Sequence, residues 1–285
     1  MKQFAIAAGS DIQANRTDQL QNSRLNSDIK LIVCMLASGS KGNAIYISDN
    51  STSILVDSGL SGVEIEKRLK SRGLNPSELD AILVTHEHAD HIHGVGILSR
   101  RFSLPVYISR KTGMGIPAKT GHISDMINFE CGSTFMLKTL KIHPFSISHD
   151  AADPAGFTIT QNGAKIGIAT DLGIATSMAI EHLKGCSLLI LEANHDPDML
   201  VNGPYPWPIK QRIKSRIGHL SNEDSKKLVM KVKHPRLKHI ILAHLSEINN
   251  TPKKALSIVC EAINPSETEI DVAVQDRCGK LFCLR

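Results

Sequence analysis

The chain has 285 residues, of which 41% are hydrophobic, and it carries a formal net charge of +5. This size allows a full core in one large or two small domains, and no apolar run approaches the ~20 residues that span a bilayer. The first eight residues are too short an apolar patch for a signal peptide, so we expect a cytoplasmic protein without a membrane partner. The mildly basic balance permits a phosphate-rich partner without requiring one.

Residues 1–30 are polar, rich in Asn and Gln, and show no clear periodicity. We expect them to form a loosely ordered extension, followed by one folded domain over residues 31–285. Three strands are predicted at the start of that domain, over Leu31–Leu36, Ala44–Ser48 and Ser53–Val56.

The turn between the first two strands has two compatible interpretations. Its Gly and Asn residues are ordinary turn chemistry. Backbone N–H groups there, together with Ser40, Lys41 and Asn43, could also hold a phosphate of a nucleic acid.

The third strand ends at Asp57, which on its own would be an unremarkable turn acid. A helix should follow, because Ser61 and Glu64 have the spacing of a capping box, and it should close near Gly73.

The most informative stretch is the apolar run Ala81–Val84, which ends in His86, His88, Asp90 and His91. The run predicts a buried strand that leads into a loop, and His86 and His88 then point the same way because alternate residues share a face. Imidazole and carboxylate ligands suit Zn²⁺, Mn²⁺ or Fe²⁺, and four of them on one loop could serve two adjacent ions. A polar surface loop that happens to be rich in histidine is the alternative.

A helix over residues 92–101 and a strand over Val106–Ser109 should follow, with His93 on the helix surface. Residues 110–130 look loop-like and basic, and no role is assigned to them. The six cysteines contain no Cys-x-x-Cys pair, so we expect them to be reduced and buried and not to bind metal.

Later in the chain, four predicted strands each run into a polar residue that can bind a metal or carry a proton. These residues are His149, Asp171, Glu192 and His244, after strands over residues 140–145, 165–169, 187–191 and 239–242. Taken alone, Asp171 could cap the next helix, as could Glu192. The remaining predicted elements are strands over 134–137, 156–160, 270–274 and 280–284 and helices over 175–184, 222–232 and 252–263. Two runs of strands, each followed by helices, favour two sheets face to face with helices outside.

The motif His86-x-His88-x-Asp90-His91 resembles the signature of the metallo-β-lactamase superfamily of metal-dependent hydrolases. The resemblance implies a four-layer αββα fold of class α/β (α+β), with two mixed β-sheets flanked by helices. It also implies a dinuclear site in which a hydroxide shared by the two ions is the nucleophile. One ion would be held by His86, His88 and His149, the other by Asp90, His91 and His244; Asp171 would bridge them, and Asp57 would orient the loop from behind the ligands.

Residues 31–285 are similar to the YycJ (WalJ) family within that superfamily. The most specific pieces are Gly203-Pro-Tyr-Pro-Trp-Pro208 and Leu191-Glu-Ala-Asn-His-Asp196. This resemblance implies a DNA exonuclease that works from the 5′ end. A further resemblance to ribonuclease Z implies that Glu192 and His219 support proton transfer, with a weaker case for His195. Only 72 residues separate Asp171 from His244, so the large insertion of β-CASP nucleases is missing.

Independent support for a nucleic-acid partner comes from residues 203–216. Cations that can neutralise phosphates occupy every second position there, at Lys210, Arg212 and Lys214. Two aromatic residues that can stack on bases, Tyr205 and Trp207, lie just before them. A solvated basic helix whose aromatic rings pack on the Pro-rich turn is the alternative.

The leading prediction is therefore a metal-dependent phosphodiesterase that degrades DNA, with Asp90, Glu192 and His219 as catalytic residues. An RNA-processing nuclease and a hydrolase of small esters or thioesters remain open alternatives within the superfamily. A degenerate metal site that stabilises an interaction module is disfavoured because the ligand set is complete.

Overall fold

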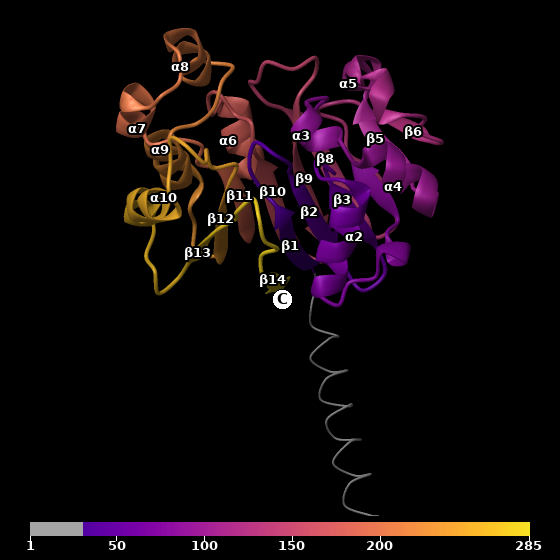
Figure 1. The fold of residues 1–285 in the computed structure, drawn as a ribbon. Coiled ribbons are helices and arrows are strands. Elements are labelled where there is room, and N and C mark those ends of the chain that lie inside the picture. Colours follow the sequence, from indigo (N-terminus) through magenta and orange to yellow (C-terminus); the bar gives the residue numbers. More distant parts are fainter. Residues whose placement is uncertain (1–30) are drawn as a thin grey trace, which may run out of the picture.

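The computed structural model describes residues 31–285, which form two β-sheets stacked face to face, with helices on the outside of the stack (Figure 1). The expected extension over residues 1–30 lies outside the described residues. None of the helices in residues 31–285 is both long enough and apolar enough to cross a membrane.

The first sheet has the order β14-β1-β2-β3-β4-β5-β6, with β3 to β6 parallel and the other neighbours antiparallel. Its strands are β1 (Leu31–Ala37), β2 (Ala44–Ser48), β3 (Ser53–Val56), β4 (Ala81–Leu83), β5 (Val106–Ser109), β6 (Met126–Phe129) and β14 (Leu281–Leu284).

The second sheet has the order β13-β12-β11-β10-β9-β8-β7, with β10 to β13 parallel and the other neighbours antiparallel. Its strands are β7 (Phe135–Leu137), β8 (Leu140–Ser146), β9 (Ala155–Gln161), β10 (Ala164–Ala169), β11 (Leu188–Glu192), β12 (His239–Ala243) and β13 (Glu269–Val272). Both sheets are therefore mixed, which confirms the predicted four-layer αββα fold.

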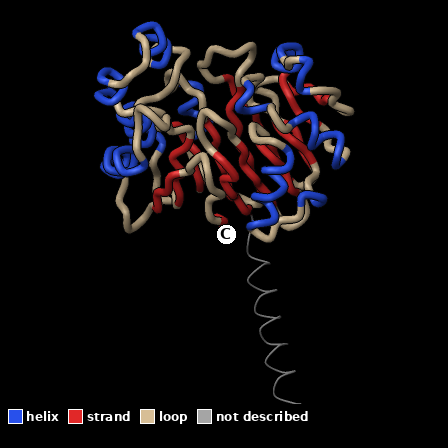
Figure 2. The backbone as a smooth tube through the Cα atoms, viewed as in Figure 1, coloured by secondary structure: helices blue, strands red, loops and turns tan. Residues whose placement is uncertain are grey.

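Helices cover the outer face of each sheet, as the blue segments of Figure 2 show on both sides of the red strands. Along the chain, four helices lie between strands β3 and β6 of the first sheet: α2 (Gly62–Ser71), α3 (Ala89–Ile92), α4 (Val95–Phe102) and α5 (Arg110–Gly115). The second sheet carries α6 (Ser177–Leu183), α7 (Pro197–Asn202), α8 (Trp207–Ile213), α9 (Asn222–Val232) and α10 (Pro252–Val259). Short 3₁₀ turns lie at Pro76–Glu78, Ala118–Thr120 and Cys260–Ala262.

The layers follow from side-chain alternation along the strands. In β1, Leu31, Val33 and Met35 belong to the core between the sheets, whereas Cys34 and Leu36 belong to the core beneath the helices. Successive residues of a strand point to opposite faces, and both faces here are covered. This is why the strands near the middle of the sheets read as continuous apolar runs.

The helix predicted over residues 92–101 corresponds to α4, which begins at Val95; α3 ends at Ile92, and His93 and Gly94 separate the two helices. The Gly94 N–H donates to Ser58 O at 2.6 Å, and Asp90 O, its helical acceptor four residues back, accepts from Asn43 N at 2.7 Å. A Cβ at Gly94 would lie 2.4 Å from Leu60 O, so the chain needs glycine to pass this close. The exposed position of His93 agrees with the prediction.

Residues 110–130 are not the loop that the sequence suggested, since they contain α5 and β6. Gly113 and Gly115 weaken the helical signal of α5, which is instead supported by Ser109 Oγ accepting from Thr112 N. The strand β6 exists because it pairs in parallel with β5, a tertiary contact that local sequence does not record.

The cysteines are free, but they are not all buried as expected. Cys34 and Cys186 are buried, Cys283 is exposed, and Cys131, Cys260 and Cys278 lie between these extremes. Cys283 lies on β14 at the edge of the first sheet, where one strand face meets solvent.

Candidate metal centre

The predicted ligands meet at the carboxyl ends of strands from both sheets, and one of these strands, β8 before His149, is antiparallel to its neighbours. Asp57 follows β3, the histidine loop follows β4, Asp171 follows β10 and His244 follows β12. Three of these residues have left-handed backbones, with φ of 61° at Asp57, 57° at Asp171 and 55° at His244. Such conformations cost free energy in non-glycine residues and cluster where side chains must be aimed at a site.

One set of ligand atoms comes from His86, His88 and His149, all within 4.8 Å of one another. His88 Nδ1 and His149 Nε2 face each other at 3.3 Å, and His149 Nδ1 lies 3.2 Å from Gly218 O, to which it can donate. His86 Nε2 is buried without a hydrogen-bond partner. Two facing nitrogens and one unpaired nitrogen make a set that a cation would complete.

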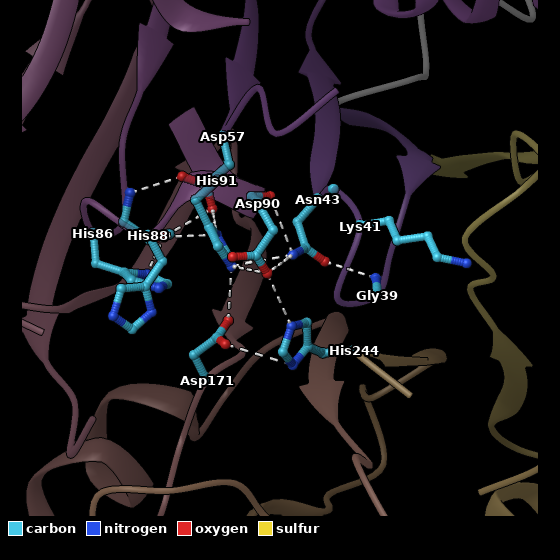
Figure 3. Close-up of polar contacts among 12 residues, drawn as sticks. Gly39, Lys41, Asn43, Asp57, His86, His88, Asp90, His91, Asp171 and His244 are labelled. Carbon is cyan, nitrogen blue, oxygen red and sulfur yellow. Dashed lines mark hydrogen bonds and ion pairs between the residues drawn. The ribbon is translucent and has the colours of Figure 1, made fainter. Parts of the chain in front are cut away.

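A second set comes from Asp90, His91 and His244, and Figure 3 shows it beside His86 and His88 of the first set. Asp90 Oδ2 lies 3.5 Å from both His91 Nε2 and His244 Nε2. His244 Nε2 is buried without a hydrogen-bond partner.

Asp171 lies between the two sets. Its Oδ2 is 3.2 Å from His91 Nε2, and its Oδ1 is 3.5 Å from His244 Nδ1 and 3.9 Å from His149 Nε2. A carboxylate with contacts to both sets has the position expected for a bridging ligand.

Asp57 supports the histidine loop from behind. Its Oδ2 lies 2.7 Å from His91 Nδ1, and its two oxygens accept from Thr85 N and Thr85 Oγ1, each at 2.8 Å. The hydrogen bond from Nδ1 leaves His91 Nε2 free to act as a ligand. Thr85 was not among the residues predicted from the sequence, although its position just before His86 was an available signal.

Glu192 joins His219 to the ligand His244. Its Oε1 lies 2.8 Å from His219 Nδ1 and 3.0 Å from His244 Nδ1, while Oε2 accepts from Leu172 N and Leu220 N. Glu192 is fully buried and therefore orients both rings rather than capping a helix. His195 is buried as well, but its Nδ1 has no partner and its ring makes no contact with the ligand rings.

In the centre, close charges of opposite sign counteract the effect of burial on the pKa values of several side chains. Burial alone would lower the pKa of His91 and His244, yet nearby Asp171 helps to hold the pKa of both well above the ordinary value. The pKa of Asp171 is held well below its usual range against burial, chiefly by His244 and His91. Burial lowers the pKa of His86, which therefore stays neutral and able to bind a cation.

The turn before β2 contributes to the centre through Asn43 rather than through a cation. Asn43 is buried, and its Nδ2 lies 3.2 Å from Asp90 Oδ2 and 3.1 Å from His91 Nε2. Ser40 is exposed, and Lys41 pairs with Glu247 at 2.6 Å, pointing away from the ligands in Figure 3. The structure thus places Asn43 among the ligands and leaves Ser40 and Lys41 at the surface.

The 203–216 segment forms α8 and its flanks, on the far side of the centre from α5 (Figure 1). Trp207 is 60% exposed and Tyr205 is half-buried. Lys210 Nζ donates to Val201 O, and Arg212 pairs with Asp150, the residue after the ligand His149. That ion pair was not anticipated, although Asp150 directly follows a predicted ligand.

The chain is similar to known proteins of one superfamily. A family model described as "Beta-lactamase superfamily domain" matches residues 52–244. The chain is 39% identical over 231 residues to the exodeoxyribonuclease YycJ of Bacillus anthracis, covering 80% of this chain and 88% of that protein. It is 37% identical over 238 residues to the exodeoxyribonuclease WalJ of Streptococcus pneumoniae, covering 80% and 87%.

Among solved structures, the metallo-β-lactamase fold protein YhfI of Bacillus subtilis matches with a TM-score of 0.69. The match covers 90% of this chain and all of YhfI at 17% identity, so it bears on the fold alone.

Proposed function

Because the chain belongs to the β-lactamase superfamily, in the family of the exodeoxyribonucleases YycJ and WalJ, we propose that it is a divalent-metal-dependent nuclease that removes nucleotides from the 5′ end of DNA. The observation that carries the metal chemistry is the convergence of four side chains from one loop and three from distant strands on a single buried point.

The donor set fits divalent cations. Its nitrogens and carboxylate oxygens are the ligands that Zn²⁺, Mn²⁺ and Fe²⁺ share, and no cysteine of residues 31–285 belongs to the clusters. His86 Nε2 and His244 Nε2 are buried without partners, which is costly unless a ligand completes them. We infer two ions, one for each set, with Asp171 between them.

The ions would lower the pKa of water and stabilise the charge that builds on the attacked phosphoryl group. Asp90 is 23% exposed at its side chain and so is the most accessible of the four carboxylates of the centre. Its Oδ2, which lies 3.5 Å from both His91 Nε2 and His244 Nε2, is suited to accept a proton from the attacking water.

His219 is suited to protonate the leaving oxygen. Burial would lower its pKa, but the nearby carboxylates, chiefly Glu192, outweigh burial and raise it above the ordinary value, which favours the protonated ring. Its side chain is 18% exposed and can reach a substrate, whereas Glu192 is fully buried. Glu192 therefore acts as a positioning residue that fixes the ring through Nδ1.

The case for DNA over a small ester rests on the named relatives and on the surface beside the centre. The exposed Trp207 can stack on an unpaired base, and Lys210, Arg212 and Lys214 can neutralise phosphates. We include Ser40 and Lys41, which are exposed at the turn before β2, as further phosphate contacts.

A substrate panel tests the proposal. Metal-loaded protein should release labelled mononucleotide from 5′-labelled linear DNA, and Asp90→Ala should abolish the release. Structured RNA, a generic phosphodiester and a small thioester complete the panel. Turnover of RNA alone, or of the thioester alone, would overturn the assignment to DNA, and an Asp90→Ala variant with full activity would overturn the assigned site.

A further inference from the structure

A cavity of about 380 Å³ adjoins the metal centre on the side of α9. His219 is the wall that the two share, since it lines the cavity and its Nδ1 lies 3.9 Å from Asp171 Oδ1. The volume falls near the lower end of the ~300–1,000 Å³ range of small-molecule sites, which suits one nucleotide end and excludes a duplex. None of the ligands proposed above lines it.

The charge of the cavity is positive. One face of α9 lines it with Asp224, Lys227 and Lys231, which recur at helical spacing, and Lys214 faces them from the end of α8. Asp224 is the one acidic residue of the lining, and it is already engaged by Lys227 Nζ at 2.9 Å and Ser221 Oγ at 2.8 Å. The amines of Lys214 and Lys231 make no ion pair within residues 31–285.

The cavity also contains a buried polar group without a partner. His195 is only 3% exposed, lines the cavity and has an Nδ1 atom with no hydrogen bond. Burial lowers the pKa of His195 to about 4, so its ring is neutral at physiological pH and can donate one hydrogen bond. Buried polar atoms without partners are uncommon and point to a ligand that completes them.

We propose that this cavity binds the terminal phosphate monoester at the 5′ end of the DNA strand, next to the bond that is cleaved. The inference rests on the proposed nuclease function and names the strand end that the centre selects. A terminal monoester carries about −1.5 to −2 charges at pH 7 and three acceptor oxygens. An internal phosphodiester carries a single charge, so three lysines against one engaged aspartate favour the terminal group.

The position of the cavity makes end recognition part of catalysis. His219 separates the cavity from the ligands, so a strand whose end lies against Lys214 and Lys231 presents its first phosphodiester to the centre. A cavity of about 380 Å³ accommodates one terminal nucleotide, so a strand end held there would be cleaved at its first phosphodiester.

Binding to the full-length chain tests the proposal, with and without a chelator so that the result does not depend on turnover. Thymidine 5′-monophosphate, thymidine 3′-monophosphate, thymidine and inorganic phosphate are titrated by calorimetry. We expect the 5′-monophosphate to bind in both conditions, thymidine not to bind, and Lys231→Ala to weaken the binding about tenfold, as expected when a charged hydrogen bond is removed.

The matched control is Lys238→Ala, which removes an exposed lysine at the opposite end of β12 and should leave binding unchanged. Equal binding of inorganic phosphate would identify a free-phosphate site, tighter binding of the 3′-monophosphate would reverse the polarity, and binding insensitive to Lys231→Ala would place the phosphate elsewhere. Each of these results contradicts the proposal.

Kinetics separates this inference from the nuclease assignment. The ratio of kcat/KM for 5′-phosphorylated over 5′-hydroxyl DNA should exceed one in the natural chain and fall about tenfold in Lys231→Ala. Digestion of both substrates at one rate would refute the cavity while leaving the nuclease intact. Absence of digestion together with phosphate binding would refute the nuclease while leaving the cavity.

Discussion

Two buried carboxylates, Asp57 and Glu192, decide how the ligand imidazoles are oriented. Each carboxylate accepts a hydrogen bond from the Nδ1 atom of a histidine, so the other ring nitrogen of that histidine faces the centre. Neither carboxylate is one of the proposed ligands, so their substitution separates ligand orientation from ligand identity.

Replacing Asp57 with Asn should weaken metal binding about 10- to 100-fold, because the amide supports His91 less well than the carboxylate does. Competition against a chromophoric chelator measures the change. The matched control is Asp49→Asn, since Asp49 is a similar acceptor of hydrogen bonds from Ser51, Thr52 and Thr139 in the turn before β3, at its opposite end from Asp57. An equal decrease of metal affinity in both variants would remove the assigned role of Asp57.

Replacing Glu192 with Gln should lower kcat by about 10²- to 10⁴-fold and leave KM for DNA little changed. The reason is that a neutral amide would no longer raise the pKa of His219 or fix its ring through a charged hydrogen bond. The double variant with His219→Asn should be no worse than the more impaired single variant, because the two residues act as a unit. Additive decreases of kcat with normal metal content would show that they act separately.

At the scale of elements, β1 and the segment before β14 meet through a pair of thiols. Cys34 Sγ lies 3.5 Å from Cys278 Sγ, and Arg72 at the end of α2 donates to Cys278 O. The hydrogen bond from Cys34, aided by Arg72, lowers the pKa of Cys278 from 9.0 to about 6 against the effect of burial. Cys278 should therefore be a thiolate at neutral pH.

Alkylation by iodoacetamide tests this pH dependence. The rate at Cys278 should rise through a midpoint near pH 6, because the thiolate is the reactive form and its population grows as the pH passes the pKa. Peptide mass spectrometry follows the rate, with exposed Cys283 as the internal reference. Arg72→Ala should move the midpoint upward, and a midpoint at about 8.5 in the natural chain would contradict the assignment.

The helix α8 carries cations that we assign to phosphate binding, and this assignment predicts a salt effect. Lys210→Gln with Lys214→Gln should reduce the slope of log K against log salt by about 0.7 for each phosphate that is no longer neutralised on single-stranded DNA. Arg212 should matter less because Asp150 already neutralises it. Fluorescence anisotropy in chelator measures binding, and Lys141→Gln with Lys238→Gln at the far ends of β8 and β12 is the control. An unchanged slope would remove α8 from the interface.

For the whole molecule, the centre joins the two sheets, because its proposed ligands follow β4 in one sheet and β8, β10 and β12 in the other. Metal that binds only the folded chain stabilises it by mass action. Removing the metal should therefore loosen the contact between the sheets at this edge.

Chelation should lower Tm by about 5–10 °C, if the metal is present at ~100 times its dissociation constant before removal. Differential scanning fluorimetry measures the shift, and added Zn²⁺ or Mn²⁺ should reverse it. A variant with His86→Ala and His88→Ala should show no response to the chelator. A response as large as that of the natural chain would mean that the stabilising metal binds elsewhere.

The sequence by itself determined the elements whose cause is local. The apolar run before His86 specifies a strand that ends at the ligands, and Ser61 with Glu64 specifies the start of α2. The ligands were proposed because polar residues follow several predicted strands and because the His86-x-His88-x-Asp90-His91 motif resembles that of the metallo-β-lactamase superfamily. Where local signals were weak, as at Gly113 and Gly115 of α5, the prediction was wrong.

Only the tertiary structure decided which polar groups meet. Glu192 lies 52 positions from His244, and they meet because β11 and β12 are neighbours in parallel register; it lies 27 positions from His219, which is brought close where Asn194 N donates to Leu220 O. The same holds for the cavity between Lys214 and Lys231, which no spacing in the sequence reveals. The sequence specifies the side-chain types and the succession of strands along the chain. The distances between side chains follow from strand pairing and from the packing of the two sheets.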